Sequence, residues 1–209
     1  MNFLVNKIVC AIGCVAKDNN SKLNAKHIAF AAMALALAVA TSMIKVIKLP
    51  MGGSVTLFSM LFIVLIGYWY GIKTGLTAAL AYGVLQLLLD PYILNIPQVL
   101  LDYILGFGAL GLSGIFSNSK HGLIKGYIVG VIGRFICSFL SGWIFFAVYT
   151  PEFFNSAILY SIVYNGSYIG LEAAVTLVVI SLPPVNKALA YVKNNLVSVS
   201  YTHLRAHET

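Results

Sequence analysis

Residues 54–72 read SVTLFSMLFIVLIGYWYGI, an unbroken apolar segment without a charged side chain. A membrane-spanning α-helix needs about 20 consecutive apolar residues to cross a hydrocarbon core about 30 Å thick. The segment therefore predicts a membrane span. The rest of the chain has the same character, since 60% of its 209 residues are hydrophobic and 9% are charged, against about 25% charged in a soluble domain. The composition predicts an all-α, polytopic membrane protein.

Six membrane spans are predicted in total, separated by breaks that carry Pro, Gly or charged residues. The length suits one helical bundle, residues 25–186, followed by a cytoplasmic segment, residues 187–198. The third predicted span is short, and the fifth is long enough to tilt or to lose a turn to a loop. The predicted spans are His27–Ile47, Ser54–Ile72, Thr74–Leu89, Pro97–Phe116, Leu123–Tyr149 and Ser156–Leu182.

The N-terminal residues 1–24 contain an apolar stretch, residues 8–16, that is flanked by lysines and too short to span a membrane. We expect a cytoplasmic or interfacial extension rather than a signal peptide, because no small-residue cleavage site is followed by a soluble domain. Cys10 and Cys14 lie four residues apart and would share a helical face. They could bind a metal or be acylated, although small apolar residues on a helix surface are the simpler interpretation.

The last eleven residues, 199–209, read VSYTHLRAHET and break the apolar pattern abruptly. They look like the in-frame translation of a transposon-type sequencing-library adapter. We interpret them as an artefact rather than a native polar tail and leave them out of the functional argument.

The lysines predict the orientation of the bundle. With the N-terminus inside, nine of them fall on the cytoplasmic side and two on the outer side, which favours N-in/C-in by the positive-inside rule. The inner group is Lys7, Lys17, Lys22, Lys26, Lys73, Lys120, Lys125, Lys187 and Lys193, and the outer group is Lys45 and Lys48. Because these charges are scattered at span ends rather than clustered, the net charge of +7 does not indicate nucleic-acid binding.

Away from the span ends, where Lys45 and Lys125 lie, only three charged residues fall inside the predicted spans, namely Asp102, Arg134 and Glu172. An ionised group in hydrocarbon costs at least about 2.5 kcal/mol, so it normally faces a partner, a cavity or a ligand. Function is therefore expected at these three positions.

Asp102 lies near the outer start of the fourth predicted span. It is four residues after Gln98, so the two side chains share a helical face. A carboxylate near a helix N-terminus is favourably placed and stays ionised, ready for a cationic ligand. The alternative is an ordinary helix charge in the headgroup region.

The fifth predicted span carries a small, polar stripe at i, i+4, i+7 and i+8, formed by Arg134, Ser138, Ser141 and Gly142. Three aromatic residues follow near its outer end, Trp143, Phe146 and Tyr149. They could form an interfacial aromatic belt or a surface that stacks on a heteroaromatic cation. The sequence alone favours the belt.

The sixth predicted span places Asn165 and Glu172 seven residues apart on one face, with Tyr160 and Tyr164 one or two turns further out. A buried Glu needs a proton or a cation, and Arg134 is the one intramembrane candidate in the sequence. We predict a structural Arg134–Glu172 pair, with a role in ligand coupling as the less favoured alternative.

Ala32, Ala36 and Ala40 repeat every four residues along the first predicted span and form a smooth stripe. Such stripes let another helix approach closely in lipid. Composition alone leaves two interpretations equally open, internal packing and a docking surface for another membrane subunit.

The first outer loop joins the rigid Pro50 to the permissive Gly52 and Gly53. A loop of this kind can cover a pocket and move, although an ordinary tight connection would look the same.

Several patterns typical of enzymes do not occur in the sequence. There is no nucleotide-binding loop, HExxH motif, nucleophile–His pair or pair of carboxylates at catalytic spacing, and no inverted repeat of broken, charged helices. The sequence indicates neither a membrane enzyme nor a self-powered carrier.

Three motifs together resemble the thiamine-specific substrate-binding (S) components of energy-coupling factor (ECF) transporters. They are LPMGGSVTL at 49–57, QVLLDYILGFGALG at 98–111, and YSIVYNGSY at 160–168 together with Glu172. The resemblance covers about residues 25–184. It implies a six-helix S component that binds thiamine from outside under the first outer loop. It also implies docking through the alanine stripe onto one transmembrane coupling subunit and two cytoplasmic ATPases.

The resemblance also implies a ligand site. Family binding positions fall on Tyr92, Asp102, Tyr103, Tyr160 and Asn165. With the polar and aromatic neighbours named above, the predicted ligand-binding set is Tyr92, Gln98, Asp102, Tyr103, Ser138, Trp143, Phe146, Tyr160, Tyr164 and Asn165.

The chain departs from the family at three of these positions. Asp102 stands where a glutamate is common, Ser138 where a histidine can occur, and Phe146 where a tryptophan can occur, for which Trp143 could compensate.

We therefore predict a non-enzymatic cell-membrane subunit that binds thiamine as its transported ligand, without a cofactor or metal. A carboxylate, an amide and several tyrosines suit a monocation with an aminopyrimidine ring. One alternative ligand is a thiamine precursor or another heteroaromatic vitamin. A different class of protein, a membrane scaffold without a ligand, is also left open.

Overall fold

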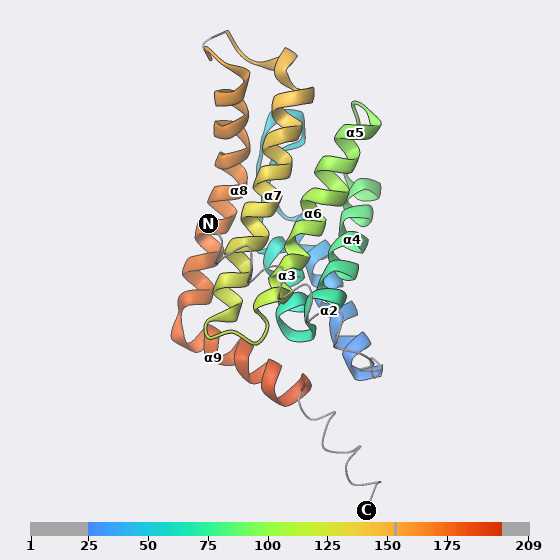
Figure 1. Cartoon of the computed structure of the whole chain (residues 1–209), viewed down its shortest axis with the longest axis vertical. Coiled ribbons are helices and arrows are strands. Elements are labelled where there is room, and N and C mark those ends of the chain that lie inside the picture. Colours follow the sequence, from blue (N-terminus) through green and yellow to red (C-terminus); the bar gives the residue numbers. More distant parts are fainter. Residues whose placement is uncertain (1–24, 153, 198–209) are drawn as a thin grey trace, which may run out of the picture.

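The computed structural model describes residues 25–152 and 154–197, which form a bundle of roughly antiparallel helices (Figure 1). The predicted N-terminal extension, with Cys10 and Cys14, and the predicted artefact, residues 199–209, lie outside the described residues. The principal helices are α2 (Ala25–Met43), α3 (Ser59–Tyr70), α4 (Ile72–Leu89), a helical segment Ile96–Phe116, α7 (Gly122–Phe145), α8 (Ala157–Ser181) and α9 (Pro183–Val192).

In this described part, four helices are long and apolar enough to cross a membrane, namely α4, the segment Ile96–Phe116, α7 and α8. The apolar parts of α2 and α3 are shorter, His27–Met43 and Ser59–Tyr70. The predicted all-α membrane architecture is confirmed in this coarser form. The fifth predicted span does lose its last turn: α7 ends at Phe145, and a separate short turn, η4, covers Ala147–Tyr149.

The second predicted span is wrong at its outer end. Ser54–Thr56 form a strand, β2, which pairs antiparallel with β1 (Lys45–Lys48) across the short turn η1 (Pro50–Gly52). Phe58 then turns the chain into α3 with a left-handed backbone, φ 62°. Hydropathy could not separate strand from helix here, because both conformations can bury an apolar run. We call residues 45–56 the lid segment.

The core of the bundle lies around α3. Eight of its twelve residues are buried, from Ser59 to Gly67, and α2, α4, α7 and the segment Ala109–Phe116 surround it. Glycines permit the closest backbone contacts: a Cβ on Gly114 would lie 2.4 Å from the Cα of Ile72. The chain between α3 and α4 is therefore packed closely against the segment Ala109–Phe116, at the end of α3 away from the lid segment.

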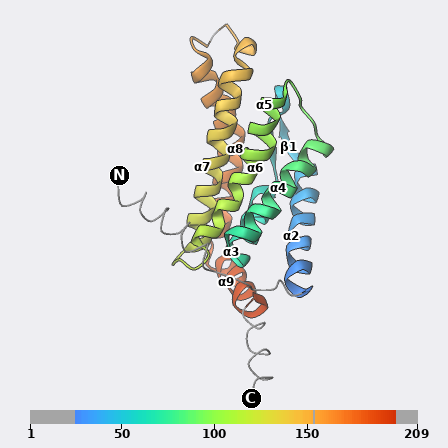
Figure 2. The same ribbon diagram turned by 45° about the vertical axis from the view of Figure 1, so that its right-hand side comes forward.

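Helix α9 closes the end of the bundle opposite the lid segment, across the helix axes (Figures 1 and 2). Leu189 packs against the core. Just beyond α9, the Lys193 ammonium donates to the Ser117 carbonyl and lies 4.1 Å from the centroid of the Tyr68 ring. The C-terminal segment is thus anchored to the bundle.

Candidate functional site

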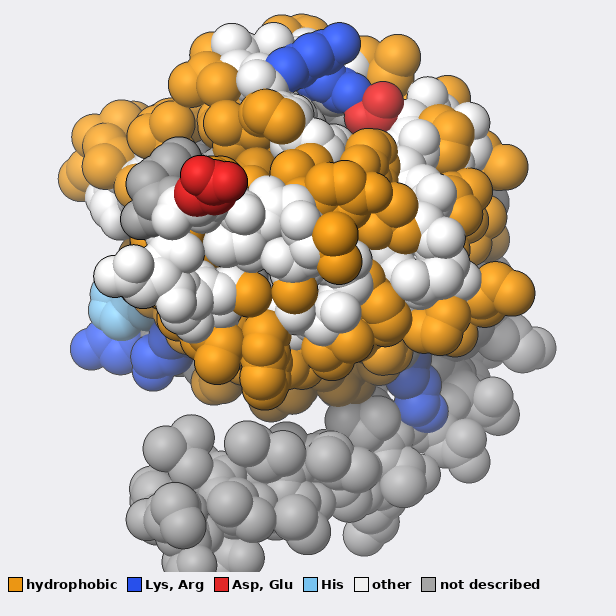
Figure 3. All heavy atoms as spheres, turned by 90° about the horizontal axis from the view of Figure 1, so that it is seen from above, with side chains coloured by type: hydrophobic (Ala, Val, Ile, Leu, Met, Phe, Trp, Pro, Cys, Tyr) orange, Lys and Arg blue, Asp and Glu red, His pale blue; other side chains and the backbone are white. Residues whose placement is uncertain are grey.

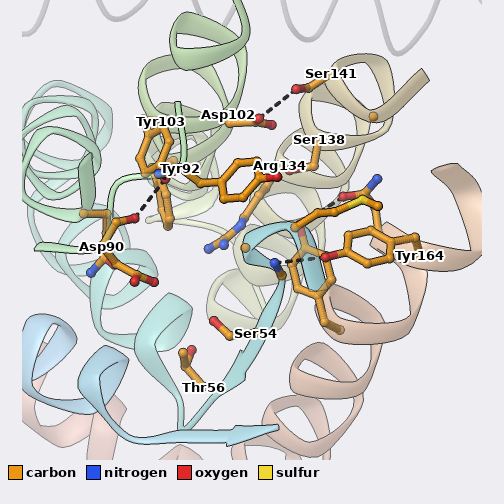
Figure 4. Close-up of a pocket in the computed structure, with 18 of the residues that line it drawn as sticks. Ser54, Thr56, Asp90, Tyr92, Asp102, Tyr103, Arg134, Ser138, Ser141 and Tyr164 are labelled. Atoms are coloured by element: carbon orange, nitrogen blue, oxygen red, sulfur yellow. Dashed lines mark hydrogen bonds between the residues drawn. The ribbon is translucent and has the colours of Figure 1, made fainter. Parts of the chain in front are cut away.

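A cavity of about 130 Å³ lies at the lid end of the bundle, between the lid segment, the loop after α4, and helices α7 and α8 (Figure 4). Most of the predicted site residues meet there, although they come from distant parts of the sequence. Nine of the ten predicted ligand-binding residues line it, Tyr92, Gln98, Asp102, Tyr103, Ser138, Phe146, Tyr160, Tyr164 and Asn165, and so do Gly52 and Gly53 of the lid segment.

Asp102 sits in a π-helical stretch, Leu100–Leu105, inside the segment Ile96–Phe116. Such stretches are rare and often occur at functional sites, because the wider turn redirects side chains. The Asp102 Oδ2 atom accepts hydrogen bonds from Gln98 Nε2 and from Ser141 Oγ, both at 2.7 Å. The predicted i, i+4 contact with Gln98 is therefore present, and Figure 4 shows the Ser141 hydroxyl directed at the carboxylate.

Gln98 organises the loop that leads into this helix. Its side chain is 1% exposed, accepts from the Leu94 N–H at 3.1 Å and donates to the Tyr92 carbonyl at 3.2 Å. Asn95 caps the helix by accepting from the Gln98 N–H at 2.8 Å. The Tyr103 hydroxyl, which accepts from the Tyr92 N–H at 2.8 Å, fixes the loop from the other side. Hydrogen bonds of Gln98 and Tyr103 with the Tyr92 backbone thus hold this residue at the cavity.

Helix α8 supplies the opposite wall. The amide of Asn165 is buried, donates to the Ser161 carbonyl at 3.0 Å and accepts from the Tyr168 hydroxyl at 3.0 Å. Gly142 of α7 permits this arrangement, because a Cβ there would lie 2.4 Å from Ser161 Oγ. These contacts fix the orientation of the wall.

The lid segment is fastened to α8 through Tyr164. The Tyr164 hydroxyl accepts from the Gly53 N–H at 3.0 Å and donates to the Pro50 carbonyl. Met51 and Gly52, between these two contacts, have positive φ values of 62° and 88°, a conformation that favours glycine. Of the predicted lid residues, Gly52 and Gly53 line the cavity and Pro50 does not. One tyrosine hydroxyl holds both ends of the turn.

The predicted Arg134–Glu172 ion pair does not form: within the described residues, the two side chains make separate contacts. The Arg134 guanidinium lines the cavity and lies 4.1 Å from the centroid of the Phe107 ring. Glu172 instead accepts hydrogen bonds from Thr56, Ser59 and Met60. Hydroxyl and backbone donors satisfy this carboxylate, so no cation is required.

One ion pair at the rim of the cavity has no counterpart in the sequence analysis. Lys45 of β1 pairs with Asp90, which follows α4, and both residues line the cavity. Figure 3 looks down on this end of the molecule, where basic side chains lie beside an acidic one near one edge and hydrophobic side chains dominate the surface. Because Lys45 neutralises Asp90, the carboxylate left to face a ligand is that of Asp102, and Arg134 supplies the opposite charge.

Trp143 was predicted to bind ligand but does not line the cavity. It is 42% exposed and stacks on Phe139 with ring centroids 6.2 Å apart. Phe146 lies just past the end of α7 and does reach the cavity, where it stacks on Tyr92 at 5.7 Å. Phe146 and Tyr92 therefore form an aromatic wall of the cavity, and Trp143 does not contribute to it.

Sequence reasoning missed the floor and one side of the cavity. Gln86 of α4 donates to Ser42 of α2 at 2.7 Å, and both line the cavity. The available signal was a polar side chain inside each of two apolar spans. The other lining residues outside the predicted ligand-binding set include Met51, Ser54, Thr56, Ser59, Tyr82, Phe107, Ser161 and Tyr168.

The alanine stripe on α2 faces outward. Ala32, Ala36 and Ala40 are exposed, whereas Ala34 and Ala38 are 4% and 0% exposed and pack in the core. Packing inside this bundle is therefore excluded as the role of the stripe.

Comparison with known proteins gives consistent matches. The model of the family described as "Thiamine transporter protein" matches residues 28–192. The chain is 32% identical over 136 residues to the thiamine transporter ThiT of Bacillus subtilis (strain 168), covering 58% of this chain and 70% of that protein. It is 26% identical over 129 residues to ThiT of Lacticaseibacillus paracasei, covering 54% of this chain and 64% of that protein.

A solved structure has a similar fold. ThiT from Listeria monocytogenes superposes with a TM-score of 0.61 at 24% sequence identity, covering 76% of this chain and 94% of that one. The two proteins therefore share a fold.

Proposed function

The chain belongs to the thiamine transporter protein family, and we propose that it is the membrane subunit of an ECF-type importer that captures thiamine from outside the cell. The family is one of transporters rather than enzymes, and the chain is a membrane protein. The observation that carries the proposal is the Asp102 carboxylate, which lines a cavity among tyrosines, beside a lid segment fastened to α8.

The chemistry of the cavity suits thiamine. Thiamine carries one positive charge on its thiazolium ring, and Asp102 offers the negative charge to pair with it. The stacked Tyr92 and Phe146 rings provide a flat surface for a heteroaromatic cation. The Asn165 amide and the neighbouring hydroxyls can exchange hydrogen bonds with the aminopyrimidine ring. Arg134 can donate to the oxygen of the hydroxyethyl arm.

Six spans with both termini inside remain our proposal for the topology. The lysines within the described residues support it, because Lys73, Lys120, Lys125 and Lys187 follow helix breaks at the end opposite the lid segment, where α9 lies. Under the positive-inside rule that end is cytoplasmic, and the lid segment then opens to the outside. The domain division 1–24, 25–186, 187–198 and 199–209 remains a proposal from the hydropathy pattern and the adapter-like end of the sequence.

We propose that the exposed alanine stripe docks onto the transmembrane coupling subunit of an ECF module with two cytoplasmic ATPases. Two observations support this. The stripe lies on the exposed surface of α2, and small side chains let another helix approach closely in lipid. The bundle also contains no sequence motif for nucleotide binding, so energy has to come from other subunits.

Isothermal titration calorimetry of the purified protein in detergent tests the ligand assignment. Calorimetry is preferable to intrinsic tryptophan fluorescence, because neither Trp69 nor Trp143 lines the cavity. Saturable thiamine binding supports the proposal. Tight binding of an aminopyrimidine or thiazole precursor, with weak binding of thiamine, would assign the site to that precursor instead. Absence of binding to all of them would favour a membrane scaffold.

A further inference from the structure

Glu172 of α8 lies outside the cavity lining, yet its carboxylate accepts four hydrogen bonds. Oε2 accepts from the Thr56 N–H at 3.2 Å and from Thr56 Oγ1 at 2.7 Å. Oε1 accepts from Ser59 Oγ at 3.2 Å and from the Met60 N–H at 3.3 Å. The residue is 5% exposed. A buried carboxylate with this many donors is held in one position.

These bonds join three elements at one point. Thr56 ends strand β2 and with it the lid segment, Ser59 and Met60 begin α3, and Glu172 belongs to α8. Phe58, between the strand and α3, has φ 62° and offers α3 no side-chain cap. The Glu172 carboxylate takes over that task, since a negative charge at a helix N-terminus is stabilised by the unpaired N–H groups there. The base of the lid segment is thereby fixed to the wall of the cavity.

The lid segment is thus attached to the same helix at its tip and at its base, where Tyr164 and Glu172 lie eight residues or about 12 Å apart along α8. At the tip, the Tyr160 hydroxyl also donates to Met51 Sδ at 3.8 Å. At the tip, Tyr164 is half-buried and makes bonds between neutral groups. At the base, Glu172 is buried and makes bonds to a charged group, which are stronger. If the lid segment opens, the tip is therefore the attachment that releases.

Resting on the proposed capture of thiamine, we propose that Glu172 is a positioning residue for ligand retention. Its carboxylate is the fixed pivot that makes the lid tip meet Tyr164 when the lid segment closes. Without the pivot, the strand end and the start of α3 move independently of α8. The lid tip then forms its hydrogen bonds to Tyr164 less often, and a bound ligand dissociates faster. A carboxylate that merely stabilised the fold would leave the rate of ligand escape unchanged.

The test follows the dissociation of radiolabelled thiamine from the detergent-solubilised protein after addition of excess unlabelled thiamine. In Glu172→Gln one oxygen is replaced by an NH₂ group that faces donors, so we expect dissociation about tenfold faster than in the wild type. Tyr164→Phe removes the hydroxyl that bonds the Gly53 N–H and the Pro50 carbonyl at the tip, and it should also speed dissociation. Thiamine should dissociate from the double variant more slowly than the two single rate increases, multiplied together, would predict. The reason is that the tip contact matters less once the pivot is lost.

Thr176→Val is the matched control. It is an isosteric change at a fully buried position one turn further along α8, and it should leave the dissociation rate within twofold of the wild type. Unchanged dissociation in Glu172→Gln, or effects that multiply fully in the double variant, would overturn the pivot.

If Glu172→Gln does not fold, Thr56→Val decides the matter. It removes the 2.7 Å hydroxyl donor to Glu172 and the 2.7 Å contact of the same hydroxyl with Ser59 Oγ, while the Glu172 carboxylate stays in place. Its coupling to Tyr164→Phe is measured in the same way. A coupling supports the pivot, and full multiplication of the effects rejects it. Failure of the wild type to bind thiamine would instead refute the proposed function, so the two failures are distinguishable.

Discussion

Replacement of Asp102 by Asn tests the electrostatic basis of ligand binding most directly. The substitution keeps the size of the side chain and an oxygen that can accept from Gln98 or Ser141, but it removes the charge. A carboxylate and a monovalent cation about 5 Å apart attract each other by about 3 kcal/mol at an effective dielectric constant of about 20. Part of this is recovered by water and by the remaining polar groups. We therefore expect the thiamine Kd to rise by about 30- to 150-fold.

Calorimetric titration of two ligands isolates the charge. One ligand is thiamine, and the other is an isosteric analogue with an uncharged ring in place of the thiazolium. Asp102→Asn should weaken thiamine strongly and change binding of the neutral analogue by less than about threefold, since no cation is present to lose its partner. The matched control, Asp102→Glu, keeps the charge and should bind thiamine within about fivefold of the wild type. Equal losses for both ligands would show that Asp102 acts through shape or folding, and the electrostatic argument would be refuted.

Three further predictions concern the wall, the docking surface and the lid. Trp143→Phe should leave the thiamine Kd within about twofold, because this side chain lies outside the cavity; calorimetry checks this. Ala36→Trp should abolish thiamine uptake by cells that supply the ECF module and leave binding by the purified subunit intact, since the added ring blocks a close helix approach on the outer face of α2. Gly53→Ala should speed thiamine dissociation at least about fivefold, because the new Cβ would lie 2.6 Å from the Tyr164 hydroxyl and push the lid tip away.

Each of these predictions has an outcome that contradicts it. A tenfold loss of affinity in Trp143→Phe would place that ring at the ligand after all. Uptake that survives Ala36→Trp would remove the stripe as the docking surface. The control for general damage is Leu171→Trp, at an exposed position of α8, which should not impair uptake. Dissociation as slow as in the wild type for Gly53→Ala would show that the Tyr164 contact does not retain the ligand.

The parts of the site that depend on local helical spacing were predictable. Gln98 and Asp102 are four residues apart and make the contact that this spacing predicts. The same rule could have excluded Trp143: five residues at about 100° each rotate it about 140° away from Ser138 around the helix. The prediction failed there because aromatic character was given more weight than helical position.

The contacts of Glu172 could not be predicted in the same way. Its partners lie more than a hundred residues away, and two of the four donors are backbone N–H groups, which every residue carries. The prediction took a proton or a cation as the partner of a buried carboxylate, left out hydroxyl and backbone donors, and therefore paired Glu172 with Arg134. Non-local contacts of this kind follow from the packing of the bundle and not from a motif.

Because Ser54–Thr56 form a strand, α3 begins only at Ser59. This late start of α3 bears on the depth of the cavity. The twelve residues of α3 rise by about 18 Å, whereas the hydrocarbon layer is about 30 Å thick. The remaining thickness, about 12 Å, belongs to the hairpin and the cavity beneath it. The cavity therefore lies next to the level at which a longer α3 would continue, and Ser54, Thr56 and Ser59 line it there. One helical turn added to or taken from the start of α3 would change that depth by about 5 Å. The boundary between strand and helix thus limits the depth of the cavity on the side of α3.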